Sequence, residues 1–337
     1  MRVTLTATVA AQRNFAISGE SSLNAIVTAT SSGKPSLRLP VFAMFQHVEK
    51  FTFGASGASS PYANTYTLTT GTQDAHTASG TSQSVDLYSY VWLARDGRER
   101  IGNGADIKNI GVNARGIDVD WSTAGSYGSF EMVITSWDLM SNAALNEWDI
   151  ELDSNNDGVG DQVIILADYG WLTTGYADGT LGCFYVDSLG WGGVAGALWD
   201  LTGDGCDPYV DPVSSVVYFS IDAGYMWDTS VVGGAKFKVT SYNGGGWDSD
   251  STDSSSWIFV SYDDIATADY VTTGSHSNAQ FVDDLTVLDG AVGYSEPASL
   301  HALGHPSTGG RTPNLGWLMW NKYNAGSSSE IYEILHP

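Results

Sequence analysis

Polar and apolar residues alternate with a period of two in many short stretches of the chain, which is the pattern of strands that bury one face. The clearest stretches are VTLTATV (3–9), SLNAIVTAT (22–30), SLRLPVFAMF (36–45), SFEMVITSW (129–137), AKFKVTSY (235–242) and SSWIFVSYDD (255–264). No window of a dozen residues has convincing 3.6-residue periodicity, so helices are expected to be short and few. The pattern predicts an all-β chain built of antiparallel β-sandwiches.

Clusters of Gly, Ser, Asn and Asp separate these stretches and indicate turns. One cluster, DSDSTDSSS (248–256), is expected to be an exposed hairpin loop. The composition changes near residue 95, because eleven of the twelve tryptophans follow that position. We therefore predict two β-sandwich domains, residues 1–95 and residues 96–337.

The charge of the chain excludes two classes of partner. It has 38 acidic and 14 basic residues and a formal net charge of -24, so nucleic acids and anionic lipid surfaces would repel it. The longest strongly apolar run, VIILA (163–167), is far below the ~18 residues that a membrane span requires. The N-terminal MRVTLTATVAA has strand patterning instead of signal-peptide patterning, so a signal has been removed or the chain is a piece of a longer protein.

The chemically most informative segment is EWDIELDSNNDGVGDQVIILAD (147–168). It places oxygen side chains at loop positions 1, 3, 5 and 9, and Gly158 at position 6, where a calcium loop turns sharply. Position 12 is Ile164 instead of Glu, and both flanks read as strands, so we predict a structural calcium loop between strands. The alternative is a hairpin turn without metal. The predicted ligands, four side chains and one carbonyl, are Asp153, Asn155, Asp157, Val159 and Asp161.

A second, weaker metal candidate lies in WDLTGDGCDPYVD (199–211), where Asp200, Thr202 and Asp204 have related spacing. Counted from Asp200 as position 1, position 9 of the loop is Pro208, so Asp207 or Asp211 would have to supply a further ligand. The chain's two cysteines, Cys183 and Cys206, predict a disulfide if the compartment is oxidising, and two separate free thiols otherwise.

No catalytic residue is predicted. The best superficial nucleophile is Ser82 in SGTSQSVD, but the small-residue helix start that would follow a subtilisin-type serine is missing. The six histidines stand in loop-like contexts, and the chain has no helices with which to build the α/β scaffold of that triad. We expect the chain not to be an enzyme.

Several segments nevertheless resemble the non-catalytic C-terminal region of large secreted bacterial subtilisin-like serine proteases. The segments are, in order, PSLRLPVFAM (35–44), NIGVNARGIDVD (109–120), SFEMVITSWDLMSNAALNEWDIELDSNNDGVGD (129–161) and the closing hairpin NLGWLMWNKYNAGSSSEIYEIL (314–335). The resemblance implies that residues 1–95 are a fibronectin type III-like sandwich whose opening strands are absent. It carries no catalytic residue to this chain.

Two functions from different classes follow from these features. The first is an extracellular or cell-surface structural protein, stabilised by calcium, that forms a homo-oligomer, filament or layer by strand exchange, because an incomplete sandwich leaves an unpaired edge. The second is an accessory module of a secreted protease that contacts glycan, cell wall or substrate. Several aromatic residues exposed on one face would favour the second function, whereas exposed apolar edges and a swapped terminal strand would favour the first. A complete protease is the third and least favoured reading.

Overall fold

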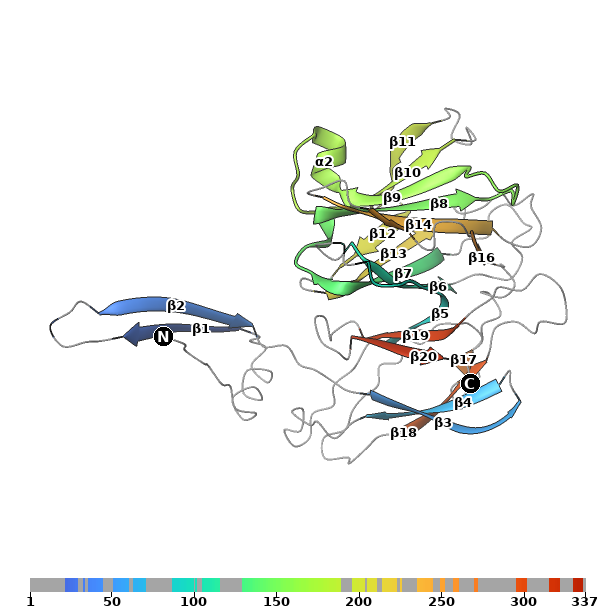
Figure 1. Ribbon diagram of the computed structural model, residues 1–337, viewed down its shortest axis with the longest axis horizontal. Helices are drawn as coiled ribbons and strands as arrows, with labels where there is room; N and C mark the ends of the chain where they lie inside the picture. The colour runs from blue at the N-terminus through green and yellow to red at the C-terminus, as the bar shows by residue number, and fades with distance from the viewer. Residues whose placement is uncertain are drawn as a thin grey trace.

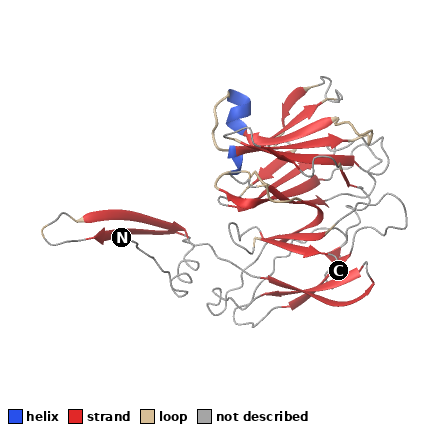
Figure 2. Ribbon diagram, viewed as in Figure 1, coloured by secondary structure: helices blue, strands red, loops and turns tan. Residues whose placement is uncertain are grey.

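The fold is seen in a computed structural model, which describes residues 22–29, 33, 36–44, 51–60, 63–70, 87–99, 101, 105–115, 129–188, 196–203, 205–210, 214–222, 225, 235–244, 249–251, 257–260, 270–271, 295–301, 315–321 and 330–335. Figure 2 shows that these residues lie mainly in β-strands and that helix is confined to one corner of the molecule. The all-β class that the alternation predicts is confirmed.

Two antiparallel sheets of seven strands each make up most of the described fold (Figure 1). We call the first sheet I; in spatial order it contains β11 (Ala197–Asp200), β10 (Leu181–Asp187), β9 (Gln162–Asp168), β8 (Asn146–Asp153), β14 (Ala235–Asn243) and β15 (Ser249–Ser251), and β16 (Ile258–Val260) also pairs with β14. Sheet II contains β12 (Cys206–Tyr209), β13 (Ser214–Asp222), β7 (Ser129–Met140), β6 (Ile107–Arg115), β5 (Leu87–Arg95), β19 (Gly316–Asn321) and β20 (Ile331–Leu335).

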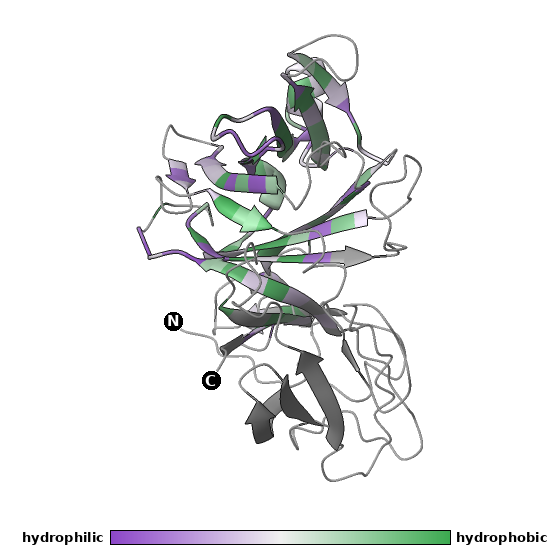
Figure 3. Ribbon diagram, turned by 90° about the vertical axis from the view of Figure 1, so that its right-hand side faces the viewer, coloured by the Kyte–Doolittle hydropathy of each residue, from purple (hydrophilic) through white to green (hydrophobic). Residues whose placement is uncertain are grey.

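One hydrophobic face of each sheet contributes to a shared core. In β8, Trp148, Ile150 and Leu152 are buried and alternate with acidic residues that point to the other face. They belong to the same cluster as Ile110 and Met132 of sheet II, so the two sheets form a sandwich. Figure 3 shows this alternation of hydrophobic and hydrophilic positions along the strands. Each large apolar side chain buried in this way contributes about 1.5–3 kcal/mol, so the inter-sheet core is the main source of stability.

Sheet II buries side chains on its second face as well. Tyr90 and Trp92 of β5 are fully buried there, and they form a separate cluster with Trp320 of β19. The Trp320 ring lies 5.6 Å from that of Tyr218 and 6.0 Å from that of Tyr209. Sheet II is therefore an interior layer, whereas polar and charged residues occupy the outer face of sheet I.

Two smaller sheets complete the described strands. The first has the order β17 (Tyr270–Val271), β18 (Ser295–His301), β4 (Ala63–Thr70) and β3 (Phe51–Ser60). The second consists of β1 (Ser22–Ala29) and β2 (Leu37–Met44), which pair antiparallel over their full length. Figure 1 shows the β1–β2 hairpin lying apart from the other strands.

Strand pairing does not follow the domain boundary expected at residue 95. β5, which ends at that residue, is hydrogen-bonded between β6 and β19 in sheet II. β4 pairs with β18, which lies more than two hundred residues later in the chain. The physical reason is that β5, LYSYVWLAR, buries apolar side chains on both of its faces, one in the inter-sheet core and the other in the second cluster, so it packs inside sheet II. The change in tryptophan content near residue 95 therefore does not separate the strands into two independent sheets.

The expected strands at 22–30, 36–45, 129–137 and 235–242 correspond to β1, β2, β7 and β14, and 255–264 contains β16. The stretch 3–9 lies outside the described residues. The expected exposed loop at 248–256 is wrong at its start, because Ser249–Ser251 forms β15 against β14 and Asp250 is buried. Alternation could not show this, because the segment has no apolar residue.

Helical structure is limited within the described residues, as expected. α2 (Tyr169–Thr174) begins after Asp168, whose carboxylate accepts from the N–H of Trp171, and ends at Gly175 with φ 79°. A single 3-10 turn, η2 (Ala143–Leu145), precedes β8. The described part of the chain contains no helix with the length and apolar character needed to span a membrane.

Candidate functional site

The predicted calcium loop, residues 153–161, connects two neighbouring strands of sheet I. β8 and β9 pair antiparallel, with Leu152 opposite Gln162, so the loop is the tip of a β-hairpin. The loop turns through two left-handed residues, Asn156 (φ 62°) and Gly158 (φ 89°). Glycine at the second position avoids the strain that a side chain would have there. The expected strand–loop–strand arrangement is thus present.

The first half of the loop folds around Asp153, which is fully buried. Its Oδ1 accepts from the N–H of Asp157 (3.0 Å) and its Oδ2 from the N–H of Gly158 (2.8 Å). The same N–H of Asp157 donates to Oδ1 of Asn155 (2.9 Å). Oxygens of Asp153 and Asn155 therefore converge on one point, and the Asp157 side chain lies beside them with its Oδ1 accepting from Val159 (2.8 Å).

Asp161 has a different position from the one the spacing suggests. Its Oδ2 accepts from the N–H and the hydroxyl of Ser154 (both 2.9 Å) and from the N–H of Asn155 (3.2 Å). The carboxylates of Asp153, Asp157 and Asp161 do not gather within 4.8 Å of one another. Asp153 and Asn155 therefore meet at the N–H of Asp157, while Asp161 holds the loop backbone and also accepts from Nδ2 of Asn155 (3.2 Å).

A lysine that the loop spacing did not suggest contacts this part of the loop. Lys236 of β14 lies directly opposite Asp153 in the sheet. Its Nζ is 3.5 Å from Oδ2 of Asp153 and donates to the carbonyl oxygen of Asn156 at 3.3 Å. The alternation in AKFKVTSY places Lys236 on the polar face of a strand, but the pairing of β14 with β8 is a long-range contact without a local signal.

Three further carboxylates follow on the same outer face of β8, and we call Glu147, Asp149 and Glu151 the β8 carboxylate row. Lys238 pairs loosely with Glu151 (3.9 Å), whereas Glu147 and Asp149 lie opposite Tyr242 and Thr240 of β14. Burial and the negative charge of Glu147 raise the pKa of Asp149 to about 7, and burial also raises the pKa of Glu147. The two carboxyl groups are hydrogen-bonded to each other, so the pair holds a proton near neutral pH.

A second acidic group links the two sheets, and no motif in the chain had indicated it. Asp96 and Glu99 follow β5, and Asp250 comes from β15; one oxygen of each lies within 4.8 Å of the others. Burial and the charges of neighbouring carboxylates raise the pKa values of Glu99 and Asp250. Oδ2 of Asp250 also accepts from the N–H of Ile107 on β6 (2.6 Å), which ties β15 to sheet II.

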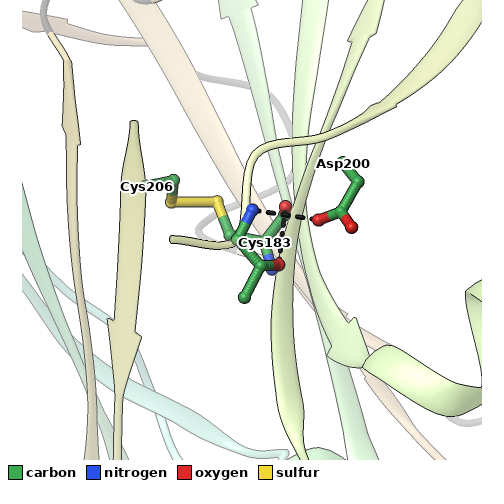
Figure 4. Close-up of a disulfide and its surroundings, with 4 residues drawn as sticks. Cys183, Asp200 and Cys206 are labelled. Atoms are coloured by element: carbon green, nitrogen blue, oxygen red, sulfur yellow. Dashed lines mark hydrogen bonds between the residues drawn. A yellow bond between two sulfur atoms is a disulfide. The ribbon is translucent and has the colours of Figure 1, made fainter. Parts of the chain in front are cut away.

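The second metal candidate is occupied by structural hydrogen bonds (Figure 4). The hydroxyl of Thr202 accepts from the N–H of Cys183 (2.9 Å) and donates to its carbonyl oxygen (3.3 Å). Asp200 accepts from the N–H of Thr202 (2.9 Å) and from the hydroxyl of Tyr169 (2.9 Å). These side chains stabilise the turn after β11 and the position of α2. Asp204, the third residue of the candidate, lies outside the described residues.

Cys183 and Cys206 form a disulfide beside this turn (Figure 4). Because β10 belongs to sheet I and β12 to sheet II, the disulfide connects the two layers of the sandwich. Such a bond persists in oxidising compartments. Ser82, the nucleophile considered and rejected on sequence grounds, lies outside the described residues.

The raised pKa of Asp149 predicts a pH-dependent stability. A carboxyl group with a folded-state pKa near 7 and an unfolded value near 3.8 favours the folded state below pH 4, and this contribution is lost as the pH rises through 7. Asp149→Asn should therefore be more stable than the parent chain by about 1–2 kcal/mol at pH 8, a value reduced for partial exposure. At pH 4 the two should unfold alike in urea. The exposed-site control is Asp207→Asn. The shared proton would be contradicted if the difference in unfolding free energy between Asp149→Asn and the parent did not change with pH, or if Asp207→Asn showed the same difference.

No protein-family model, curated protein or solved structure matches the chain. The resemblance to the accessory region of subtilisin-like proteases therefore stays a prediction, and function has to be inferred from the residues themselves.

Proposed function

We propose that the chain is a non-catalytic structural subunit, extracellular or on the cell surface, that assembles with further copies of itself by strand pairing. The observation that carries this proposal is the β1–β2 hairpin, which has no third strand among the described residues. A lone two-stranded sheet is marginally stable in water. An eight-residue strand such as β1, whose outer edge pairs with no described strand, is also a template for pairing with another chain.

The two edges of this hairpin differ in their capacity to accept a strand. Pro40 of β2 lies opposite Ile26 of β1. Because proline has no N–H, this pair cannot exchange both hydrogen bonds of a bonded pair. We therefore infer that the backbone nitrogen of Pro40 faces the outer edge of β2, which lacks a donor at this position. By the same alternation the N–H groups of Asn24, Ile26 and Thr28 face the outer edge of β1. The edge of β1 is therefore the better acceptor.

The strand that fits this edge best comes from a second copy of the chain. Residues 2–9 alternate as a strand, RVTLTATV, and are the donor that the sequence favours. Pairing of one subunit's N-terminal segment with the next subunit's β1 is β-augmentation, and its head-to-tail repetition builds a filament or layer. An extracellular setting is supported by the disulfide and by the strong negative charge, which keeps subunits soluble before assembly.

Calcium is the cofactor that we propose for the β8–β9 loop. Asp153, Asn155 and Asp157 present oxygen atoms to one region, which is the donor chemistry that calcium prefers, and the carbonyl of Val159 is the expected fourth ligand. Asp161 fixes the loop backbone. A site with so few gathered side chains suits the millimolar calcium of extracellular fluids. The bound ion would rigidify the hairpin and take no part in a reaction.

A second candidate function, glycan or cell-wall binding as an accessory protease module, is favoured by aromatic exposure around α2. Trp171 is 58% exposed and Tyr176 is 81% exposed, and both belong to one short segment. Tyr169 of the same segment is hydrogen-bonded to Asp200. Exposed aromatic rings beside carboxylates are able to stack on sugar rings and accept from their hydroxyl groups.

The calcium proposal predicts a calcium-dependent melting temperature. A chelator should lower the melting temperature of the parent chain by several degrees, because calcium at a hundredfold excess over its Kd stabilises the folded state by ~2.7 kcal/mol. Asp157→Ala should abolish this difference, whereas Asp138→Ala, an exposed acidic site outside the loop, should keep it. Identical melting of the parent chain with and without chelator would show that the loop is a plain turn.

The assembly proposal predicts oligomers that depend on the N-terminal segment and on the β1 edge. Deletion of residues 1–9 should leave monomers in sedimentation velocity, with the melting temperature of the sandwich unchanged. Ile26→Pro removes one outward N–H and should weaken assembly, whereas the matched control Ile26→Thr keeps that donor and should assemble. A parent chain that is monomeric at all concentrations, or a deletion variant that still assembles, rules strand donation out.

The glycan proposal predicts retardation of the chain in gels that contain soluble polysaccharides. Trp171→Ala should weaken this binding about three- to tenfold, the value of one aromatic stacking contact. Leu139→Ala, at a similarly exposed apolar side chain outside the α2 segment, is the control and should bind like the parent. Equal migration of all three proteins in a panel of cell-wall polysaccharides would reject this function.

A further inference from the structure

The ammonium group of Lys236 contacts the Asp153 carboxylate through Oδ2, the oxygen that also accepts from the N–H of Gly158. The register of β14 against β8 sets Lys236 directly opposite Asp153, and the ammonium contacts both the carboxylate (3.5 Å) and the carbonyl oxygen of Asn156 (3.3 Å). The Asp153 side chain is fully buried, whereas 29% of the Lys236 side chain is exposed. The protein thus supplies a mobile positive charge to the most buried acidic group of the loop.

This contact has opposite consequences for the metal-free and the metal-bound loop. Without metal, a buried carboxylate is unfavourable unless a positive charge or hydrogen-bond donors compensate it, and Lys236 contributes that charge. With metal, the ammonium and the divalent ion would share the same carboxylate, and two cations a few ångströms apart repel each other. Because its stem is partly exposed, Lys236 is able to withdraw toward solvent when the ion binds.

We infer that Lys236 is a built-in competitor of calcium, which stabilises the metal-free hairpin and lowers the affinity of the loop for the ion. The inference rests on the calcium loop proposed above and adds the residue that sets its affinity. The Lys236–Asp153 contact stabilises the metal-free loop. By linkage, it makes the free energy of calcium binding less favourable by the same amount.

Lys238 provides a matched control. It lies two residues further along the same face of β14, so Lys238→Met makes the same change in charge and strand composition. Its ammonium is 3.9 Å from Glu151 and 4.0 Å from the Trp257 ring, and no described contact joins it to the loop. A general effect of removing one positive charge from the sheet face would appear in both variants, whereas competition at Asp153 would appear in Lys236→Met alone.

The experiment is calorimetric titration of calcium into the chelator-treated full chain, with melting curves in chelator and in excess calcium. Lys236→Met should bind calcium about tenfold more tightly than the parent chain, the effect of one close charge pair at a partly exposed site. Lys238→Met should stay within about twofold of the parent, because its charge is more distant and more screened. In chelator Lys236→Met should melt below the parent, and in saturating calcium this difference should shrink or reverse.

The outcomes separate the inference from the calcium proposal. If the parent and Lys236→Met bind calcium equally, or Lys238→Met gains as much, the calcium loop stands and Lys236 is not its competitor. If none of the proteins binds calcium, both the loop proposal and the inference fall. If Lys236→Met unfolds in chelator, Lys236→Gln is used in its place. Recovery of the folded state of this variant on addition of calcium supports competition, and failure to recover in saturating calcium overturns the inference.

Discussion

Buried carboxylates have to be stabilised in a chain that has 38 acidic and only 14 basic residues. Asp153, Asp161, Asp168 and Asp250 are all buried, and burying a carboxylate is unfavourable unless donors or cations compensate its charge. Because basic side chains are few, most of the hydrogen bonds that stabilise these carboxylates come from backbone N–H groups. Loops can turn free N–H groups toward a side chain, whereas most N–H groups of paired strands are used in the sheet, and Asp153, Asp161 and Asp168 accordingly lie at strand ends. The hairpin between β8 and β9, the cap of α2 and the junction of β15 with β6 all follow from this constraint.

The same constraint explains why acidic groups of one sheet differ in their pKa values. Burial alone would raise the pKa of Asp168, but the N–H groups of Trp171, Asp178 and Gly179 donate to its carboxylate and lower it. Asp149 lies in the middle of a strand, where the backbone N–H groups are used in the sheet, and its pKa rises to about 7. The difference between these two acids thus follows from the backbone N–H groups that reach Asp168 and not Asp149, and from the negative charges of Glu147 and Glu151 beside Asp149. The lysines of β14 contact acidic residues of β8 near the loop. Lys238 contacts Glu151, and Lys236 contacts Asp153 at the end of the strand.

The sequence predicts those features that depend on neighbours in the chain. Period-two alternation located β1, β2, β7 and β14, and the spacing of Asp, Asn and Gly located a turn between two strands. These local patterns did not predict features that depend on a partner far away in the chain. β15 has no apolar residue, so only its pairing with β14 makes it a strand, and Asp250 meets Asp96 and Glu99 through that pairing. Lys236 reaches Asp153 for the same reason. Loop spacing also gave no sign that the backbone N–H groups of Ser154 and Asn155 donate to the Asp161 carboxylate.

The two outer faces of the sandwich differ in how readily they could pack against another subunit. Sheet II packs on both faces, so its aromatic residues are already covered, and the polar outer face of sheet I carries the carboxylate row. Two such acidic faces would repel each other, which disfavours face-to-face association of sandwiches. Contact through a strand edge avoids this repulsion, because main-chain hydrogen bonds carry no net charge. The β1–β2 hairpin lies away from the acidic face of sheet I in Figure 1, so the charge of the sandwich would have the least effect on the strand pairing proposed at this hairpin.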